Sequence, residues 1–163
     1  MSRQIILKHK EILLIIERLA VQVAESNLNS TNIVLIGLNE RGYFISKMVL
    51  EFLKKYLPNT LIDLRNITVS SEGEVNSTID ILNESHTVVI IDDVLNSGKT
   101  AFIAADFCFK KGVSKIETMF LAQREYRNFP IHANFVGVSI ATTLRDHVYF
   151  DNTQSTDLQV YLS

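Results

Sequence analysis

Residues 88–100, with the sequence VVIIDDVLNSGKT, constrain the fold of this chain more than any other segment. Four consecutive apolar residues are typical of a parallel strand that is buried on both faces. The strand ends in Asp92 and Asp93, whose carboxylates would be costly to bury in a core, and a turn with Gly98 then leads toward a helix. This order of elements predicts a parallel sheet covered by helices, in which ligands bind beyond the carboxyl ends of the strands.

The same alternation of strand and helix recurs along the chain and predicts a single α/β domain over residues 1–163. Residues 32–36 (NIVLI) form a second apolar run, and the segments on either side of Glu72 and Gly73 are expected to form a β-hairpin. We expect a Rossmann-like fold with a mostly parallel central sheet, helices on both faces and a small hairpin or hood. The predicted helices cover 8–26, 44–57 and 99–111, and the predicted strands cover 32–36, 61–69, 75–82, 88–94, 116–122, 135–140, 148–150 and 158–162.

Composition narrows the class of protein. The chain has 163 residues, of which 47% are hydrophobic and 21% charged, as in an ordinary globular domain. We expect no membrane segment and no signal peptide, because no apolar run is long enough to span a bilayer. Cys108 is the only cysteine, so an internal disulfide is excluded and a cytoplasmic location is expected. The net charge of −2 argues against a surface that attracts nucleic acid strongly.

The turn after the acidic pair has the properties of a phosphate-binding loop. A glycine allows the backbone to pass close to a ligand, and the amino-terminal end of a helix attracts anions. The two carboxylates suit the vicinal hydroxyls of a sugar, either directly or through Mg²⁺. Two alternatives are a simple helix cap with solvated acids and a Walker A loop, but the latter needs a glycine where Asp93 stands. The predicted phosphate loop consists of Asn96, Ser97, Gly98, Lys99 and Thr100.

These residues resemble the phosphoribosyl pyrophosphate (PRPP) motif of the type I phosphoribosyltransferases, which is an apolar strand, two acids and a Thr/Ser-Gly-x-Thr turn. Residues 37–42 (GLNERG), 121–143 and 157–162 are similar to matching segments of the bacterial pyrimidine operon attenuator group, RNA-binding regulators that are also uracil phosphoribosyltransferases. The resemblance covers essentially the whole chain. It implies that PRPP binds with Mg²⁺ and that ribose 5-phosphate is transferred to a pyrimidine base, or that a pyrimidine nucleotide binds.

The resemblance also assigns roles to individual residues. Asp92 and Asp93 are expected to hold the ribose hydroxyls, and with them any Mg²⁺ that arrives with the substrate. The turn 37–42 is expected to hold pyrophosphate, and Arg41 is its catalytic cation; an arginine at a helix start is otherwise unfavourable without an anion nearby. The remaining residues expected in this turn are Asn39, Glu40 and Gly42, although the family commonly has lysine at the position of Asn39.

A third group of candidates follows the strand predicted at 116–122. Arg124, Arg127 and Ile140 are expected near the base or the pyrophosphate. For the two arginines a salt bridge at the rim of the site is an equally good interpretation, and both interpretations stay open.

Two features depart from the family. Residues 66–74 match its flexible catalytic loop, which carries a Tyr-Arg-Asp sequence where this chain has Ser70, Ser71 and Glu72, and residues 66–98 contain no lysine or arginine. The arginine-rich first helix of the regulators is also replaced by apolar residues, so we expect weak RNA binding and association into a homo-oligomer, a dimer or tetramer. The alternatives to a slow enzyme are an RNA-binding regulator and a nucleotide sensor without catalysis.

Overall fold

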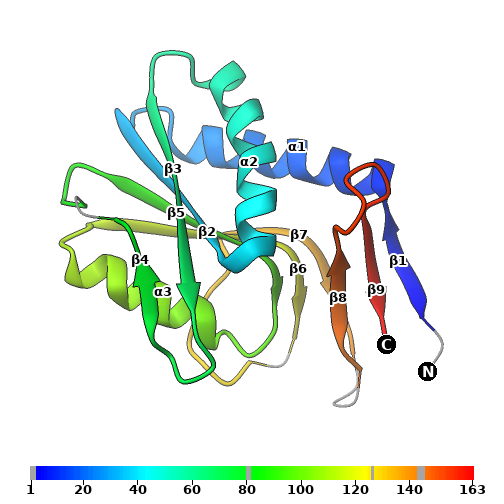
Figure 1. The fold of residues 1–163 in the computed structure, drawn as a ribbon. Helices are drawn as coiled ribbons and strands as arrows, with labels where there is room; N and C mark the ends of the chain where they lie inside the picture. Colours follow the sequence, from blue (N-terminus) through cyan, green and yellow to red (C-terminus); the bar gives the residue numbers. More distant parts are fainter. Residues whose placement is uncertain (1–2, 80–81, 126, 143–145) are drawn as a thin grey trace.

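The computed structural model describes residues 3–79, 82–125, 127–142 and 146–163. Strands and helices alternate along most of the chain, as Figure 1 shows. The helices are α1 (His9–Ser26), α2 (Asn39–Tyr56) and α3 (Lys99–Lys110), and the strands are β1 (Gln4–Lys8), β2 (Asn32–Leu38), β3 (Leu61–Val69), β4 (Val75–Ser77), β5 (Thr87–Leu95), β6 (Lys115–Arg124), β7 (Phe135–Ile140), β8 (Val148–Asp151) and β9 (Gln159–Leu162).

The central sheet has six strands in the order β4-β3-β2-β5-β6-β7. All its neighbouring strands are parallel except the β3–β4 pair. Helices α1 and α2 pack on one face of the sheet, where they share a core with Leu35, Val89 and Leu121. Helix α3 packs on the other face against Ile36 and Ile90. The structure therefore confirms the predicted α/β fold with a mostly parallel sheet and helices on both faces.

The strands β2 and β5 lie side by side, so their carboxyl ends meet at one edge of the sheet. Helix α2 begins at the residue after β2, and this short connection depends on close backbone contact. A Cβ atom at Gly37 would lie 2.3 Å from the Cα atom of Tyr43, and one at Gly42 would lie 2.4 Å from the carbonyl oxygen of Ile91. Both glycines are thus required for the first turn of α2 to lie against the end of β5.

The expected hairpin is formed by β3 and β4, which pair Val69 with Val75 and Ile67 with Ser77. Its tip is closed by hydrogen bonds between the N–H of Ser70 and the carbonyl of Glu74 (2.9 Å) and between the N–H of Gly73 and the carbonyl of Ser70 (3.0 Å). The prediction of a strand as far as residue 82 was wrong, because β4 ends at Ser77. Ile79 and Leu82, which supplied the apolar pattern, are buried outside any strand, in the core beneath α3; the predicted strand also includes residues 80–81, which lie outside the described residues.

A second, three-stranded antiparallel sheet has the order β1-β9-β8 and stands beside the central sheet in Figure 1. Strand β1 was not predicted. It pairs Gln4 with Leu162 at the other end of the chain, so its structure depends on a partner that is remote in sequence.

Candidate functional site

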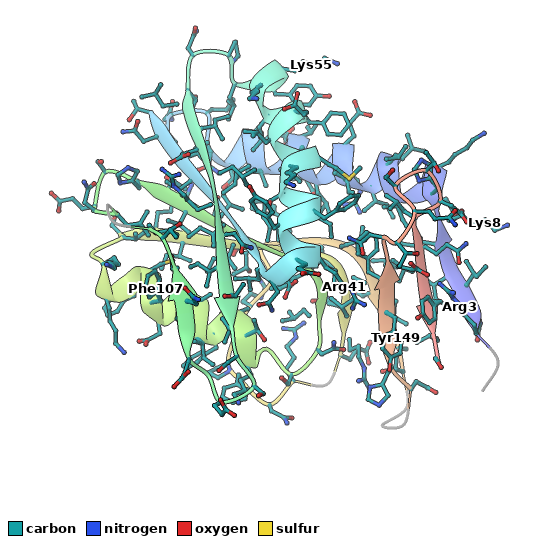
Figure 2. The ribbon with its side chains drawn as sticks, in the orientation of Figure 1. Arg3, Lys8, Arg41, Lys55, Phe107 and Tyr149 are labelled. Atoms are coloured by element: carbon teal, nitrogen blue, oxygen red, sulfur yellow. The ribbon has the colours of Figure 1, made fainter. Side chains whose placement is uncertain are left out.

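A cavity of about 510 Å³ opens at the carboxyl ends of β2 and β5. It brings together three segments that the sequence singled out separately: the start of α2, the acidic pair at the end of β5, and the phosphate loop (residues 96–100). Figure 2 shows Arg41 at the amino-terminal end of α2. The cavity is lined by Asn39, Glu40, Arg41, Asp92, Asp93, Val94, Leu95, Asn96, Ser97, Gly98, Lys99, Thr100, Ala101 and Phe120.

The phosphate loop is held in shape from outside the cavity. Gly98 has φ +83°, a left-handed conformation that favours glycine, and a Cβ atom there would lie 2.8 Å from the Cγ2 atom of Ile131. The carbonyl of Ser97 accepts hydrogen bonds from the N–H groups of Asn128 and Phe129, both at 3.0 Å. Helix α3 begins at Lys99, so N–H groups of its first turn, which have no partner within the helix, lie at this loop. The loop can therefore present backbone N–H groups to an anion while its contacts with residues 128–131 stay in place.

The environment of Asp92 opposes its ionisation. Burial, and then the negative charge of Asp93, raise the pKa of Asp92 well above its usual range. The Oδ1 atom of Asp92 accepts a hydrogen bond from the N–H of Asp93 (2.9 Å), and the Oδ1 atom of Asp93 accepts one from Val94 (2.8 Å). The Oδ2 atom of Asp93 forms an ion pair with Arg41 at 3.7 Å, which links the acidic pair to the start of α2.

Asn39 and Asn66 connect the start of α2 to β3. Asn39 has φ +51°, and its side-chain oxygen accepts a hydrogen bond from the N–H of Val69 at 3.0 Å. Asn66 donates to the carbonyls of Gly37 and Asn39, both at 2.8 Å. Asparagine tolerates the left-handed conformation better than most residues, so this pair stabilises the turn that presents Arg41. Sequence reasoning missed this role of Asn66, for which a polar amide near the end of β3 was the only signal.

The remaining predicted residues lie outside the cavity lining. Gly42 lies directly beneath it, because a Cβ atom there would be 3.1 Å from Asp92. The side chain of Arg124 donates to Thr142 (2.9 Å), and that of Arg127 donates to Gln123 (2.7 Å) and to the carbonyl of Ile131 (3.2 Å). Ile140 pairs with Arg124 across β6 and β7 and is buried in the core on the α1 side of the sheet.

The side chain of Lys99 leads from the phosphate loop to the hairpin. Its Nζ atom donates to the carbonyl of Ser71 at 2.8 Å, while Lys99 also lines the cavity. This contact joins the loop expected to hold phosphate to the segment that matches the family's catalytic loop, and no local sequence pattern predicted it.

The carboxylate oxygens of the cavity are compatible with a Mg²⁺ ion that arrives with a phosphorylated substrate. Among the described residues no group of three His, Cys, Asp or Glu side chains is placed to hold a metal by itself. Asp92 and Asp93 offer carboxylate oxygens at the cavity wall, and Mg²⁺ is commonly held by one or two carboxylates together with substrate phosphates.

A mostly parallel sheet with helices on both faces and a cavity at the carboxyl ends of its strands defines the class of Rossmann-like α/β proteins, which bind ligands at that edge. Within it the chain belongs to the phosphoribosyltransferase family, because residues 2–151 match the model of the phosphoribosyl transferase domain. The resemblance predicted from the sequence is thereby confirmed. No helix in the described part of the chain is long and apolar enough to cross a membrane.

Curated relatives carry the name bifunctional protein PyrR. That of Streptococcus mutans is 31% identical over 150 residues, which cover 87% of this chain and 84% of the relative. That of Haemophilus ducreyi is 33% identical and covers 82% and 80%. Among solved structures, the hypoxanthine phosphoribosyltransferase of Trypanosoma cruzi matches with a TM-score of 0.80 at 20% identity, over 96% of this chain and 95% of that one. At that identity the structural match shows the shared fold only.

Proposed function

We propose that this protein binds PRPP with Mg²⁺ and transfers its ribose 5-phosphate to a pyrimidine base, uracil, at a low rate. The observation that carries the proposal is the single cavity in which the acidic pair, the phosphate loop and Arg41 come together. Each of these groups matches one part of PRPP: the sugar hydroxyls, the 5-phosphate and the pyrophosphate.

The chemistry requires the bond between the sugar C1 atom and the pyrophosphate oxygen to break as a bond to the base nitrogen forms. The transition state resembles an oxocarbenium ion, so the task of the protein is to position the ribose and to stabilise the departing charge. Asp92 and Asp93 hold the ribose hydroxyls, the phosphate loop holds the 5-phosphate, and Arg41 faces the pyrophosphate. Asp92 and Asp93 would hold Mg²⁺ together with the substrate, and the ion would supply positive charge to the pyrophosphate.

The rate is expected to be low because the tip of the hairpin offers no cation to the departing pyrophosphate. Residues 66–98 contain no lysine or arginine, Arg65 just before them pairs with Asp63, and Lys99 just after them is bonded to the carbonyl of Ser71. Loss of one preorganised group that stabilises developing charge costs roughly a hundredfold to a thousandfold in rate. Arg41 and Mg²⁺ compensate for part of this loss.

The choice of a pyrimidine rests on sequence similarity. The curated relatives named PyrR are about as long as this chain and similar over most of it, whereas the hypoxanthine enzymes share the fold at 20% identity. We expect Arg124, Arg127 and Ile140 to lie near the base or the pyrophosphate at the ends of β6 and β7. This expectation is supported by the pairing of Arg124 with Ile140 at those strand ends.

Calorimetric titration tests the proposal directly. PRPP and uridine monophosphate should each bind at one site per chain. Mg²⁺ should raise the affinity for PRPP more than the affinity for the monophosphate, because the pyrophosphate group carries more charge. Absence of binding by either ligand, with and without Mg²⁺, would refute the proposal. Binding of both without detectable transfer would favour the second candidate, a nucleotide sensor, for which the absence of lysine and arginine from residues 66–98 is the supporting observation.

RNA binding is proposed to be weak. Arg18 is the cation that remains where the regulators' first helix is arginine-rich, and its guanidinium donates to the carbonyls of Val136 (3.3 Å) and Gly137 (2.7 Å). Leu14 on the same helix is 68% exposed, which supports burial in a homo-oligomer better than contact with phosphates. A fluorescence anisotropy titration with a pyrimidine leader hairpin should give weak binding that disappears as salt is raised; tight binding at physiological salt would contradict this.

A further inference from the structure

A hydrogen bond between Lys99 and Ser71 joins the start of α3 to the tip of the β3–β4 hairpin. Lys99 is the first residue of α3 and lines the cavity, while Ser71 lies at the tip of the β3–β4 hairpin. The ammonium group donates to the carbonyl of Ser71 at 2.8 Å. A single side chain thus lies between the expected phosphate position and the hairpin.

Few polar contacts hold the tip against α3. The flanking residues Val69 and Val75 pack in the apolar cluster that also contains Ala101 of α3. Ser71, Glu72 and Glu74 are exposed, and the three hydrogen bonds that close the tip join Ser70 to Gly73 and Glu74 within the tip itself. Gly73 lies near the side chain of Ile103, which an added Cβ atom would approach to 3.3 Å. Among residues 3–79, 82–125, 127–142 and 146–163, no other side chain of α3 donates a hydrogen bond to the tip. Within these residues Lys99 therefore supplies the side-chain hydrogen bond from α3 to the tip, in addition to the apolar packing of the hairpin.

A phosphate group is a stronger partner for Lys99 than this carbonyl. The bond from the ammonium of Lys99 to the carbonyl already has an ionised donor, and a phosphate would add an ionised acceptor and with it the attraction between two opposite charges. The carbonyl of Ser71 offers one neutral, exposed acceptor, whereas a 5-phosphate in the loop would offer charged oxygens beside the same residue. The hairpin has no lysine or arginine from residue 66 onward, and Arg65 in β3 pairs with Asp63 at 2.6 Å, so the tip has no cation with which to follow the phosphate.

We propose that Lys99 is a ligand-responsive latch: it holds the hairpin tip on α3 when the phosphate loop is empty, and it releases the tip when a 5-phosphate takes its ammonium group. The inference rests on the proposed function, since it needs a phosphate ester in this loop. Lys99 is a positioning residue in this scheme, and the hairpin is the element that responds. Because coupling between two equilibria is reciprocal, the bond to Ser71 also lowers the affinity of the site for phosphate esters.

Amide hydrogen exchange of the hairpin tip tests the latch without any measurement of activity. The N–H groups of Ser70, Gly73 and Glu74 are hydrogen-bonded in the tip and report on its opening. Saturation of the wild-type chain with ribose 5-phosphate should speed their exchange by about fivefold, which corresponds to about 1 kcal/mol at 1.4 kcal/mol per tenfold. Lys99→Met should show the faster exchange already without ligand, and ribose 5-phosphate should not change it further.

Two variants control for charge and for general loosening. Lys99→Arg keeps a cationic donor and should restore the response to ribose 5-phosphate. Lys110→Met removes the same charge from the last turn of the same helix, where Lys110 pairs with Asp106, and should behave like the wild type. Equal exchange in Lys99→Met and wild type, or binding of ribose 5-phosphate without a change at the tip, would overturn the latch alone. A wild-type chain that binds no ribose 5-phosphate, checked by calorimetry, would overturn the proposed function and the latch with it.

Discussion

The phosphate loop and the β3–β4 hairpin are joined by the Lys99–Ser71 hydrogen bond but depart from the family pattern to different extents. The acidic pair is present at the end of β5, and the loop after it has a left-handed Gly98, hydroxyl residues and an outer side held by hydrogen bonds to Asn128 and Phe129. The hairpin has its strand pairing and a closed tip, yet it has no lysine or arginine after Arg65. We infer that substrate binding and rate enhancement depend on different segments, so that one can be lost while the other is kept. The following predictions test that separation.

The largest effect is expected from the acidic pair. The double variant Asp92→Asn, Asp93→Asn should weaken PRPP binding on the order of a thousandfold, because two hydrogen bonds from charged groups are lost at about 1.5–3 kcal/mol each. The fold should survive, since both residues lie at the cavity wall at the end of β5. Calorimetry with PRPP and circular dichroism together measure this.

A matched control is the double variant Asp106→Asn, Asp157→Asn, which removes the same charge from exposed positions outside the cavity lining. It should bind PRPP like the wild type. If the double variant of the acidic pair also binds PRPP like the wild type, the two carboxylates have another role.

The next largest effect concerns the hairpin. Ser71→Arg places a cation at the tip where the family's catalytic loop carries one, and it should raise turnover by about a hundredfold, the amount that one such group typically contributes. The turnover number should rise by more than KM falls, which is the signature of a contact made in the transition state. Steady-state assays with uracil and PRPP measure both quantities.

Ser155→Arg, on an exposed loop outside the cavity lining, adds the same charge far along the chain and should leave both quantities unchanged. An equal gain from Ser155→Arg would mean that net charge, and not position, governs the rate.

A smaller effect is expected on stability. Because the pKa of Asp92 is raised in the folded state, ionisation of Asp92 opposes folding. The contribution of the protonated carboxyl to the free energy of unfolding is complete below the unfolded pKa and is lost as the pH rises through the folded pKa. Asp92→Asn keeps the acceptor for the N–H of Asp93 and should therefore stabilise the fold at neutral pH by about 1 kcal/mol. The gain should shrink as the pH falls and Asp92 becomes protonated. Thermal unfolding from pH 4 to pH 8 measures it, with Glu25→Gln on the exposed face of α1 as the control. A gain independent of pH would contradict this account, because it would mean that the pKa of Asp92 is the same in the folded and unfolded states.

Local patterns predicted the parts of this molecule whose structure is decided locally. The apolar run of β5, the turn at Gly98 and the start of α3 follow one another in sequence, so their joint geometry could be inferred before the fold was known. The meeting of residues 37–42 with Asp92 also followed, because parallel strands place their carboxyl ends at one edge of the sheet.

The sequence could not predict features that depend on remote partners. Strand β1 has a short apolar pattern that merges into α1, and it is a strand because it pairs with β9. Asn66 stabilises the turn at Asn39 only because β3 lies beside β2, and Lys99 reaches Ser71 only because the hairpin lies over the start of α3. These contacts are amide and ammonium hydrogen bonds without periodicity, so no sequence pattern signals them.

The central claim is that this chain binds PRPP with a nearly complete site but transfers its sugar slowly. A single-turnover titration, in which excess protein and Mg²⁺ are mixed with PRPP and labelled uracil, gives the half-saturating concentration and the limiting rate in one experiment. We predict clear saturation with a limiting rate roughly a hundredfold below the ~10 s⁻¹ that is typical of enzymes. A limiting rate on the order of tens per second would contradict the account and would mean that Arg41, Lys99 or another subunit supplies the missing charge.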